Sequence, residues 1–245
     1  MGHRVTTLNV NTIEPAGNTL TIGASGDSVV IGNNDIRANT YKDAGGNTLF
    51  VSDGSGNLSS INSGFGDALK LLSTQAVTNQ ASVSFASGID STYKEYVFKF
   101  YNINPATDVG DFVFQANAVG ETGYNETITS IMWRARNEES GSGPAAEKVT
   151  SSDQSQAQGT EFQQLCQGIG SGADENAAGE LHIFNPASTT YVKNFYSTIQ
   201  EYDYRNSSRI YRTGGIFNIT GAIDDVQFKM KSGNFDGTIK MFGIK

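Results

Sequence analysis

Gly17-Asn18-Thr19-Leu20-Thr21-Ile22 reads as a turn followed by a short strand, and the pattern returns 29 residues later as Gly46-Asn47-Thr48-Leu49-Phe50-Val51. Gly and Asn tolerate the positive φ angle of a tight turn, and the Thr, Leu, Ile and Val residues that follow favour extended backbone. Between the copies, Ser28-Val29-Val30-Ile31-Gly32 predicts a further strand. Short strands between small-residue turns, with an internal repeat, indicate a fibrous or solenoid-like segment.

This opening segment lacks the apolar side chains that a core of its own requires. Residues 1–64 contain too few large apolar residues to offset the conformational entropy lost when they are ordered. Burial against sister chains would supply the missing core. Phage fibres resemble this arrangement, since they wind three chains about one axis, and by that resemblance we expect an intertwined homotrimer. The candidate residues for the shared core are Leu20, Ile22, Val29, Ile31, Leu49 and Val51. The alternative is a disordered Gly-rich linker. The runs of β-branched residues argue against it, because linkers seldom contain such runs.

Composition restricts the class of protein. The chain has 245 residues, of which 28 are Gly and only 17% are charged, with a formal net charge of −8. Lys and Arg form no cluster, which argues against nucleic-acid binding. Cys166 is the single cysteine, so neither a disulfide framework nor a thiolate metal site is expected. With no long apolar stretch and no signal peptide, we expect a virion or extracellular all-β protein with no membrane contact.

The distribution of aromatic residues divides the chain into two domains. Only Tyr41 and Phe50 precede residue 64, whereas the other aromatic residues follow it. We therefore predict an N-terminal β-repeat shaft over residues 1–64, for attachment and trimerisation, and a C-terminal head domain over residues 65–245 that contains the aromatic core.

The head domain shows regular strand signals separated by Asn, Gly, Asp and Pro. Strands are expected at 81–85, 96–101, 112–116, 128–133, 180–184, 192–199, 215–219, 226–230 and 238–242. Residues 68–73 fit either a helical turn or a first strand, and residues 137–160 are polar and small enough to predict a long surface loop. Nine or ten short strands without a convincing helix predict an antiparallel β-sandwich of jelly-roll or lectin-like type.

Several blocks of the head domain resemble one family. They are Leu72-Ser73-Thr74-Gln75, residues 89–96, residues 104–108, residues 179–186 and residues 232–240. The similar proteins are virion structural proteins, of tail-fibre or fibre-like type, of tailed phages that infect marine bacteria and cyanobacteria. The resemblance covers about residues 68–245, while residues 1–64 are similar only in style to the repetitive shafts of trimeric phage fibres.

This resemblance implies a trimeric virion appendage with its shaft at the attachment end and its head outward, located on the tail or on the capsid surface. Its partners would be sister chains, another virion protein bound through the N-terminal region, and host-surface polysaccharide. A capsid decoration or head fibre without a receptor role is the alternative, followed by a polysaccharide-degrading spike. No binding residue is carried over from the family.

The residues themselves give little sign of catalysis. His3, His182 and Cys166 are not arranged as a catalytic triad in the sequence. The carboxylate pairs, such as Glu138 with Glu139, are adjacent in sequence, and adjacent residues of a strand point to opposite faces. We therefore expect no enzymatic activity, no cofactor and no metal site.

Binding of a glycan is the most specific activity that the sequence suggests. Sugars stack their C–H faces on aromatic rings and present hydroxyl groups to polar side chains. The residues that supply this mixture are Trp133, Arg134, Tyr202, Asp203, Tyr204, Arg205 and Tyr211. The competing interpretation is that these aromatic residues cap the core or pack between protomers.

Overall fold

The computed structural model of the chain describes residues 38–61, 68–141, 143–149 and 154–245. The chain divides into two compact units, Met1–Phe65 and Gly66–Lys245. From the sequence, the boundary is expected one residue earlier, between residues 64 and 65. The predicted strands at 19–22 and 28–32 lie outside the described residues. Leu20, Ile22, Val29 and Ile31 lie there too, so their role in a shared core stays a prediction.

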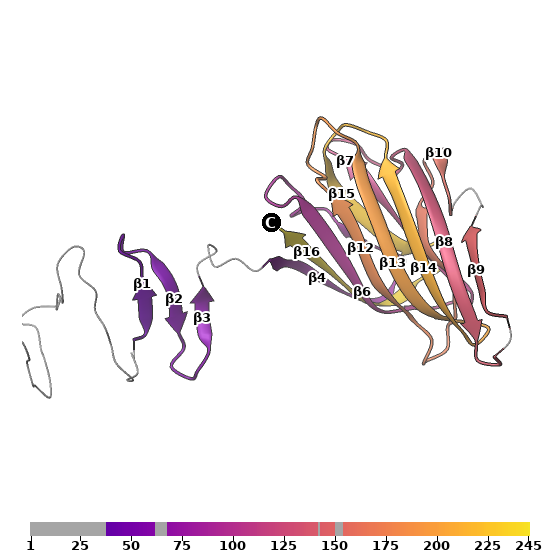
Figure 1. Ribbon diagram of the computed structural model, residues 1–245, viewed down its shortest axis with the longest axis horizontal. Helices are drawn as coiled ribbons and strands as arrows, with labels where there is room; N and C mark the ends of the chain where they lie inside the picture. The colour runs from indigo at the N-terminus through magenta and orange to yellow at the C-terminus, as the bar shows by residue number, and fades with distance from the viewer. Residues whose placement is uncertain (1–37, 62–67, 142, 150–153) are drawn as a thin grey trace, which may run out of the picture. The chain divides into compact units, whose positions relative to one another are not determined.

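The described part of the first unit is a small antiparallel sheet (Figure 1). Its strands β1 (Thr40–Lys42), β2 (Thr48–Ser52) and β3 (Leu58–Ile61) pair in the order β1-β2-β3. Two similar turns connect them. The Asp43 carboxylate accepts hydrogen bonds from the backbone and side-chain nitrogens of Asn47, and Asp53 does the same with Asn57. These bonds lower the pKa of both carboxyl groups.

This first sheet contains no buried residue among those described. Leu49 and Val51 on β2 are half-buried, and Tyr41 stacks on Phe50 with ring centroids 4.5 Å apart. Leu58 and Ile61 on β3 are 52% and 55% exposed. Within the described residues, therefore, the sheet has apolar side chains but no core in which to bury them.

The second unit is a sheet of 13 strands that folds into two facing layers. In Figure 1 the front layer lies nearer the viewer, with β7 and β15 behind it. The front layer contains β4 (Leu69–Gln80), β16 (Phe235–Ile244), β6 (Glu95–Pro105), β12 (Ala177–Phe184), β13 (Lys193–Asp203), β14 (Ser207–Phe217), β8 (Ile128–Glu138) and, both paired to β8, β9 (Ala145–Val149) and β10 (Ala157–Gly159). The back layer contains β11 (Gln163–Ile169), β7 (Gly110–Ala118), β15 (Ile223–Met230) and β5 (Ser82–Phe85).

The two layers are joined into a nearly closed, barrel-like sheet. At one end Ile169 of β11 pairs with Asp203 of β13, and at the other β4 runs directly into β5. The strand pairs of the second unit are antiparallel, and no helix occurs in the described residues. The predicted all-β class is thus confirmed. The same stretches include no helix long and apolar enough to cross a membrane.

The core between the layers is rich in phenylalanine. Phe228 of β15 lies at its centre, with its ring centroid 5.1 Å from that of Phe98 and 5.2 Å from that of Phe100. Rings from both layers meet there because inward positions alternate along each strand. Edge-to-face and offset contacts of this kind stabilise a core beyond the area they bury.

Two parts of the sequence prediction are corrected by the structure. The segment 137–160 is not one long loop, because β9 pairs with β8 through residues such as Ala146 with Ala135, and β10 pairs with β8 as well. The strand β11 was missed because it is rich in glutamine. Gln163 is nevertheless buried, and its side-chain nitrogen donates to the carbonyl oxygens of Gln154 and Gln164, so the amide is satisfied without water. Of the two alternatives for residues 68–73, the structure shows the strand, because residues 69–73 lie in β4.

Candidate functional site

Away from the phenylalanine cluster, the inward face of the front layer is charged. Glu201 and Asp203 on β13, Arg209 and Tyr211 on β14, and Arg134 and Arg136 on β8 are pairs spaced by two residues, so each pair faces the interior. The register brings the three strands together. Glu201 pairs with Arg209, which pairs with Arg136, and Tyr211 pairs with Arg134.

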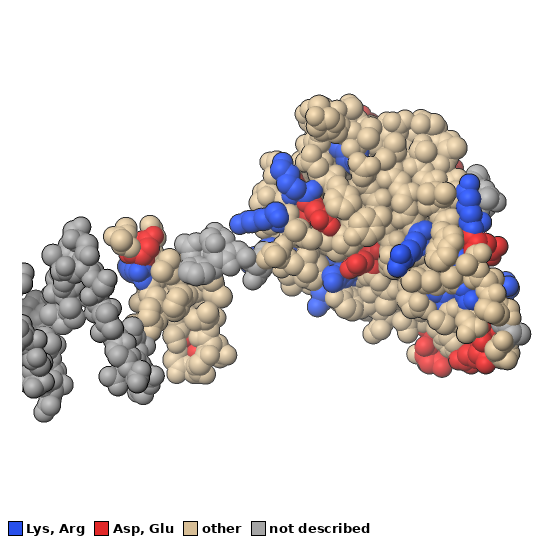
Figure 2. Space-filling model, viewed as in Figure 1, with Lys and Arg blue, Asp and Glu red and all other residues tan. Residues whose placement is uncertain are grey.

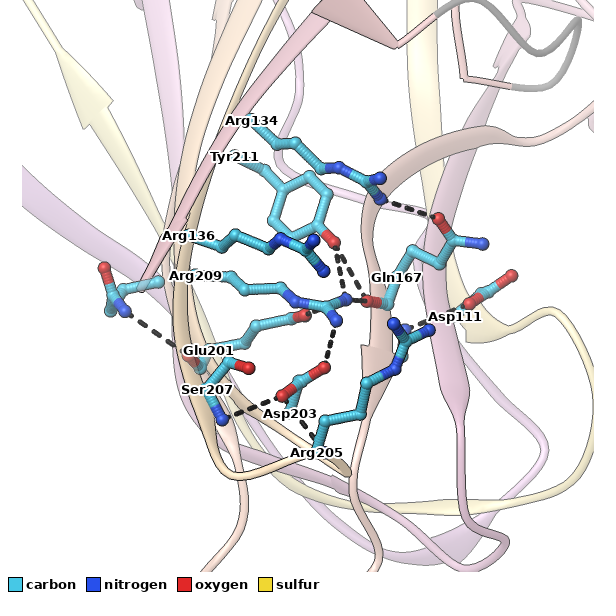
Figure 3. A network of polar contacts seen from close by, with 12 residues as sticks. Asp111, Arg134, Arg136, Gln167, Glu201, Asp203, Arg205, Ser207, Arg209 and Tyr211 are labelled. Atoms are coloured by element: carbon cyan, nitrogen blue, oxygen red, sulfur yellow. Dashed lines mark hydrogen bonds and ion pairs between the residues drawn. The ribbon is translucent and has the colours of Figure 1, made fainter. Parts of the chain in front are cut away.

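Arg209 is the centre of this buried network (Figure 3). Its guanidinium binds the Asp203 carboxylate, and its Nη1 lies 3.8 Å from Oε1 of Glu201. The Tyr211 hydroxyl donates to the backbone oxygen of Gln167 over 3.0 Å, which fixes the ring beside the guanidinium. Asp203 also accepts the backbone N–H of Ser207 at 2.9 Å. The side chains of Glu201, Asp203 and Arg209 are buried, so this is an ion pair removed from solvent.

Burial raises the pKa of the Glu201 carboxyl to about 8, against the opposing effects of the Cys166 thiol and the Arg209 guanidinium. At neutral pH, Glu201 is therefore largely protonated, and Asp203 alone neutralises Arg209. Burial also raises the pKa of the Cys166 thiol, and a buried thiol with a raised pKa is a poor nucleophile.

A cavity of ≈ 210 Å³ opens beside this network. We call it the arginine pocket. It is lined by Val109, Arg134, Arg136, Gln167, Gly168, Tyr204, Arg205 and Arg209. Figure 3 shows Arg134, Arg136 and Arg209 extending from the strands toward Gln167, while Arg205 approaches from the turn after β13. Four of the eight lining residues are arginines, and none is a carboxylate.

The opposite, outward face of the same strands forms a groove of ≈ 400 Å³. We call it the Trp133 groove. It is lined by Ile131, Trp133, Tyr196, Ser197, Thr198, Arg212, Thr213 and Gly214. Trp133 and Tyr196 are each 41% exposed. Uncharged residues make up most of the face that the front layer presents in Figure 2.

Gly214 explains why this groove is hollow. Along one row of the sheet Tyr196 pairs with Gly214, which in turn pairs with Ile131. A Cβ atom added to Gly214 would meet no atom within 4 Å. The backbone of Gly214 therefore forms the floor of the groove, because this residue has no side chain to fill the space. Tyr196 is held from its other side by His182, whose ring stacks on it at 4.4 Å with an interplanar angle of 12°.

The structure separates the predicted glycan-contact residues into four places. Arg134, Tyr204 and Arg205 line the arginine pocket. Asp203 and Tyr211 are buried behind it, where they hold Arg209 rather than face solvent.

The remaining two predicted residues lie elsewhere. Trp133 lies in the groove on the other face, because it neighbours Arg134 in the strand. Tyr202 lies in neither place, and its hydroxyl is within hydrogen-bond distance of Glu139, at 3.1 Å. Whether any of the seven contacts a glycan stays a prediction.

Several residues of these sites were missed from the sequence. Arg136 and Arg209 lie two residues from Arg134 and Tyr211, and this alternation was a usable signal. Tyr196 and Gly214 gave none, because their meeting depends on the register between strands. The described residues include no group of three or more His, Cys, Asp or Glu side chains placed to hold a metal ion.

Comparison of the chain with protein-family models, with curated proteins and with solved structures finds no match. The function is therefore inferred from the residues of the chain itself, above all from the two faces of β8 and β14.

Proposed function

We propose that this chain is a virion structural protein of the fibre type. It forms a short homotrimer that anchors on the tail or capsid through its N-terminal unit and presents its C-terminal β unit to polysaccharide of the host surface. The facing layers of that unit suit a β-sandwich of jelly-roll or lectin-like type. The observation that carries the binding role is the Trp133 groove.

The groove has the dimensions and chemistry of a sugar site. Tyr196 and Ile131 lie on strands two spacings apart, which is about 10 Å, with Gly214 between them. Trp133 and Tyr196 offer exposed aromatic rings to the C–H face of a sugar, since aromatic rings combine a large apolar face with a polar edge. Arg212 and Thr198 add hydrogen-bonding groups beside them.

Binding fits this groove better than hydrolysis does. Glycoside hydrolysis uses two carboxyl groups on either side of the bond that is cleaved, and no carboxylate lines the groove. Glu201 has the raised pKa of a general acid, but it lies inside the sheet with Asp203, where no substrate reaches. A polysaccharide-degrading spike is therefore the weaker proposal.

The anchoring role is supported by the first sheet. Its half-buried Leu49 and Val51 and its exposed Leu58 and Ile61 are apolar side chains without a core of their own. Association with the same strands of sister chains would bury them, as would docking on another virion protein. The same unit would serve a capsid decoration that lacks a receptor role.

Glycan binding by the full-length protein tests the proposal. Gly214→Val fills the floor of the groove at a position where an added Cβ atom meets no atom within 4 Å, and valine suits a strand. We expect it to weaken binding to host-surface polysaccharide at least tenfold. The matched control is Asn194→Val, an exposed outward position of the neighbouring strand, which we expect to bind as the wild type does. Equal binding by both variants, or no binding of any host polysaccharide by the wild type, would contradict the proposal.

A further inference from the structure

We propose that the arginine pocket binds a small oxyanion, namely the sulfate, phosphate or carboxylate group of a ligand. This inference goes beyond the carbohydrate groove, because the pocket lies on the inward face of β8 and β14 and shares no residue with the Trp133 groove. It rests on the charge, the free donors and the size of the pocket.

Four guanidinium groups line the pocket, and the carboxylates near them lie outside its lining. One of these, the Asp111 carboxylate, accepts the backbone N–H of Gly168 at 3.2 Å. Arg209 is paired with Asp203, and Arg134 is paired with Glu147, whose Oε1 lies 2.6 Å from Nη2. Arg136 has a weaker partner, since its Nη1 lies 3.9 Å from Glu138. The fourth guanidinium, of Arg205, lies over the Tyr204 ring at 4.8 Å. An acidic protein that brings four arginines to one small cavity holds there a local field suited to an anion.

Two arginines of the pocket, Arg136 and Arg209, also carry a buried Nε atom that makes no hydrogen bond. A buried donor without an acceptor is unfavourable, and an oxyanion would supply the acceptor. Guanidinium groups bind sulfate, phosphate and carboxylate oxygens in pairs, which is why arginine predominates in such sites.

The size of the cavity limits the ligand to a single group. Its ≈ 210 Å³ is below the ~300–1,000 Å³ of sites that enclose whole drug-sized ligands. Gly168 keeps one wall open, since a Cβ there would lie 3.3 Å from Nη1 of Arg209 and 3.5 Å from the Tyr204 ring. One charged group fits, whether it is a free inorganic anion or the substituent of an acidic polysaccharide.

Calorimetric titration of the full-length protein with sodium sulfate, at constant ionic strength set by chloride, tests the pocket. We expect saturable binding that Arg136→Gln weakens at least tenfold. The control is Lys70→Gln, which removes one positive charge from an exposed position of β4 and should leave sulfate binding unchanged. Heat that does not saturate, or equal binding by the wild type and Arg136→Gln, would overturn the proposal.

Two further arms complete the experiment. If Arg136→Gln does not fold, Arg205→Gln takes its place, because that side chain is exposed, and unchanged sulfate binding would again overturn the proposal. Competition by dextran sulfate but not by dextran would identify a polymer-borne group as the ligand, whereas competition by inorganic phosphate alone would identify a free anion. Gly214→Val should retain sulfate binding. The proposal for the pocket and the proposal for the carbohydrate groove are therefore tested independently.

Discussion

The two units of the chain obtain their stability in different ways. The second unit buries a cluster of phenylalanines around Phe228 within one chain. The first sheet places Leu49, Val51, Leu58 and Ile61 on strands of similar composition, and none of its described residues is buried. Both units thus form a sheet, but among the described residues only the second unit buries apolar side chains in a core. Our proposal is that the first unit shares its core with sister chains.

The largest effect should follow from emptying the phenylalanine cluster. Phe228→Ala removes a ring that contacts Phe85, Phe98 and Phe100, so we expect a loss of about 3–5 kcal/mol in the free energy of unfolding. Urea denaturation of the second unit measures it. The control is Phe162→Ala at a half-buried position, where the loss should be clearly smaller. A loss below 1 kcal/mol for Phe228→Ala would contradict the proposed core.

A slightly smaller effect should follow from breaking the buried ion pair. Asp203→Asn leaves the Arg209 guanidinium without its carboxylate, and the loss of one partner from a buried pair costs roughly 3 kcal/mol. The protonated Glu201 nearby can ionise and recover part of that loss. The exposed Glu121→Gln, measured by the same denaturation, should change stability by less than about 0.5 kcal/mol. If the two variants are equally stable, the ion pair between Asp203 and Arg209 contributes nothing to the free energy of unfolding.

The pH dependence of stability should reveal Glu201. Its pKa is about 8 in the folded protein and near its ordinary value of 4.5 in the unfolded chain, so folding favours the protonated form. Its contribution is complete below pH 4.5 and is lost as the pH rises to 8, by about 1.4 kcal/mol per pH unit within that range.

Denaturation at several pH values between 5 and 8 checks this. Glu201→Gln should remove that part of the slope, and the control Glu121→Gln should keep it. An identical slope in the wild type and in Glu201→Gln would show that Glu201 does not titrate in this range.

The smallest effect on the second unit should come from changes in the first sheet. Replacing Leu49 and Val51 together with Ser removes apolar side chains that we assign to the shared core of the trimer. The second unit should keep its stability within about 0.5 kcal/mol, while size-exclusion chromatography with light scattering should show loss of the trimer. A trimer that survives both substitutions would place the association elsewhere in the chain.

A strand can be predicted from the sequence where polar and apolar residues alternate. The prediction fails where a polar side chain is buried through hydrogen bonds to residues elsewhere in the chain. Residues 96–101 and 226–230 show the alternation, and both lie in strands. The strand β11 does not, because Gln163 is buried only through the amide network that surrounds it.

The sites show the same limit. Arg134 could be named as a candidate, but its position across from Tyr211 is set by the pairing of β8 with β14. The Trp133 groove depends on the register that places Gly214 between Tyr196 and Ile131, and no local pattern in one sequence determines that register.

Hydrogen exchange of the amides of β1, β2 and β3 in the full-length protein, followed over a dilution series, tests the central claim most directly. If the first sheet shares its core with sister chains, these amides are protected while the trimer persists and lose their protection together as it dissociates, whereas the amides of the second unit stay protected. If β1 to β3 remain protected in a single chain at nanomolar concentration, the first unit folds alone and the fibre proposal is wrong.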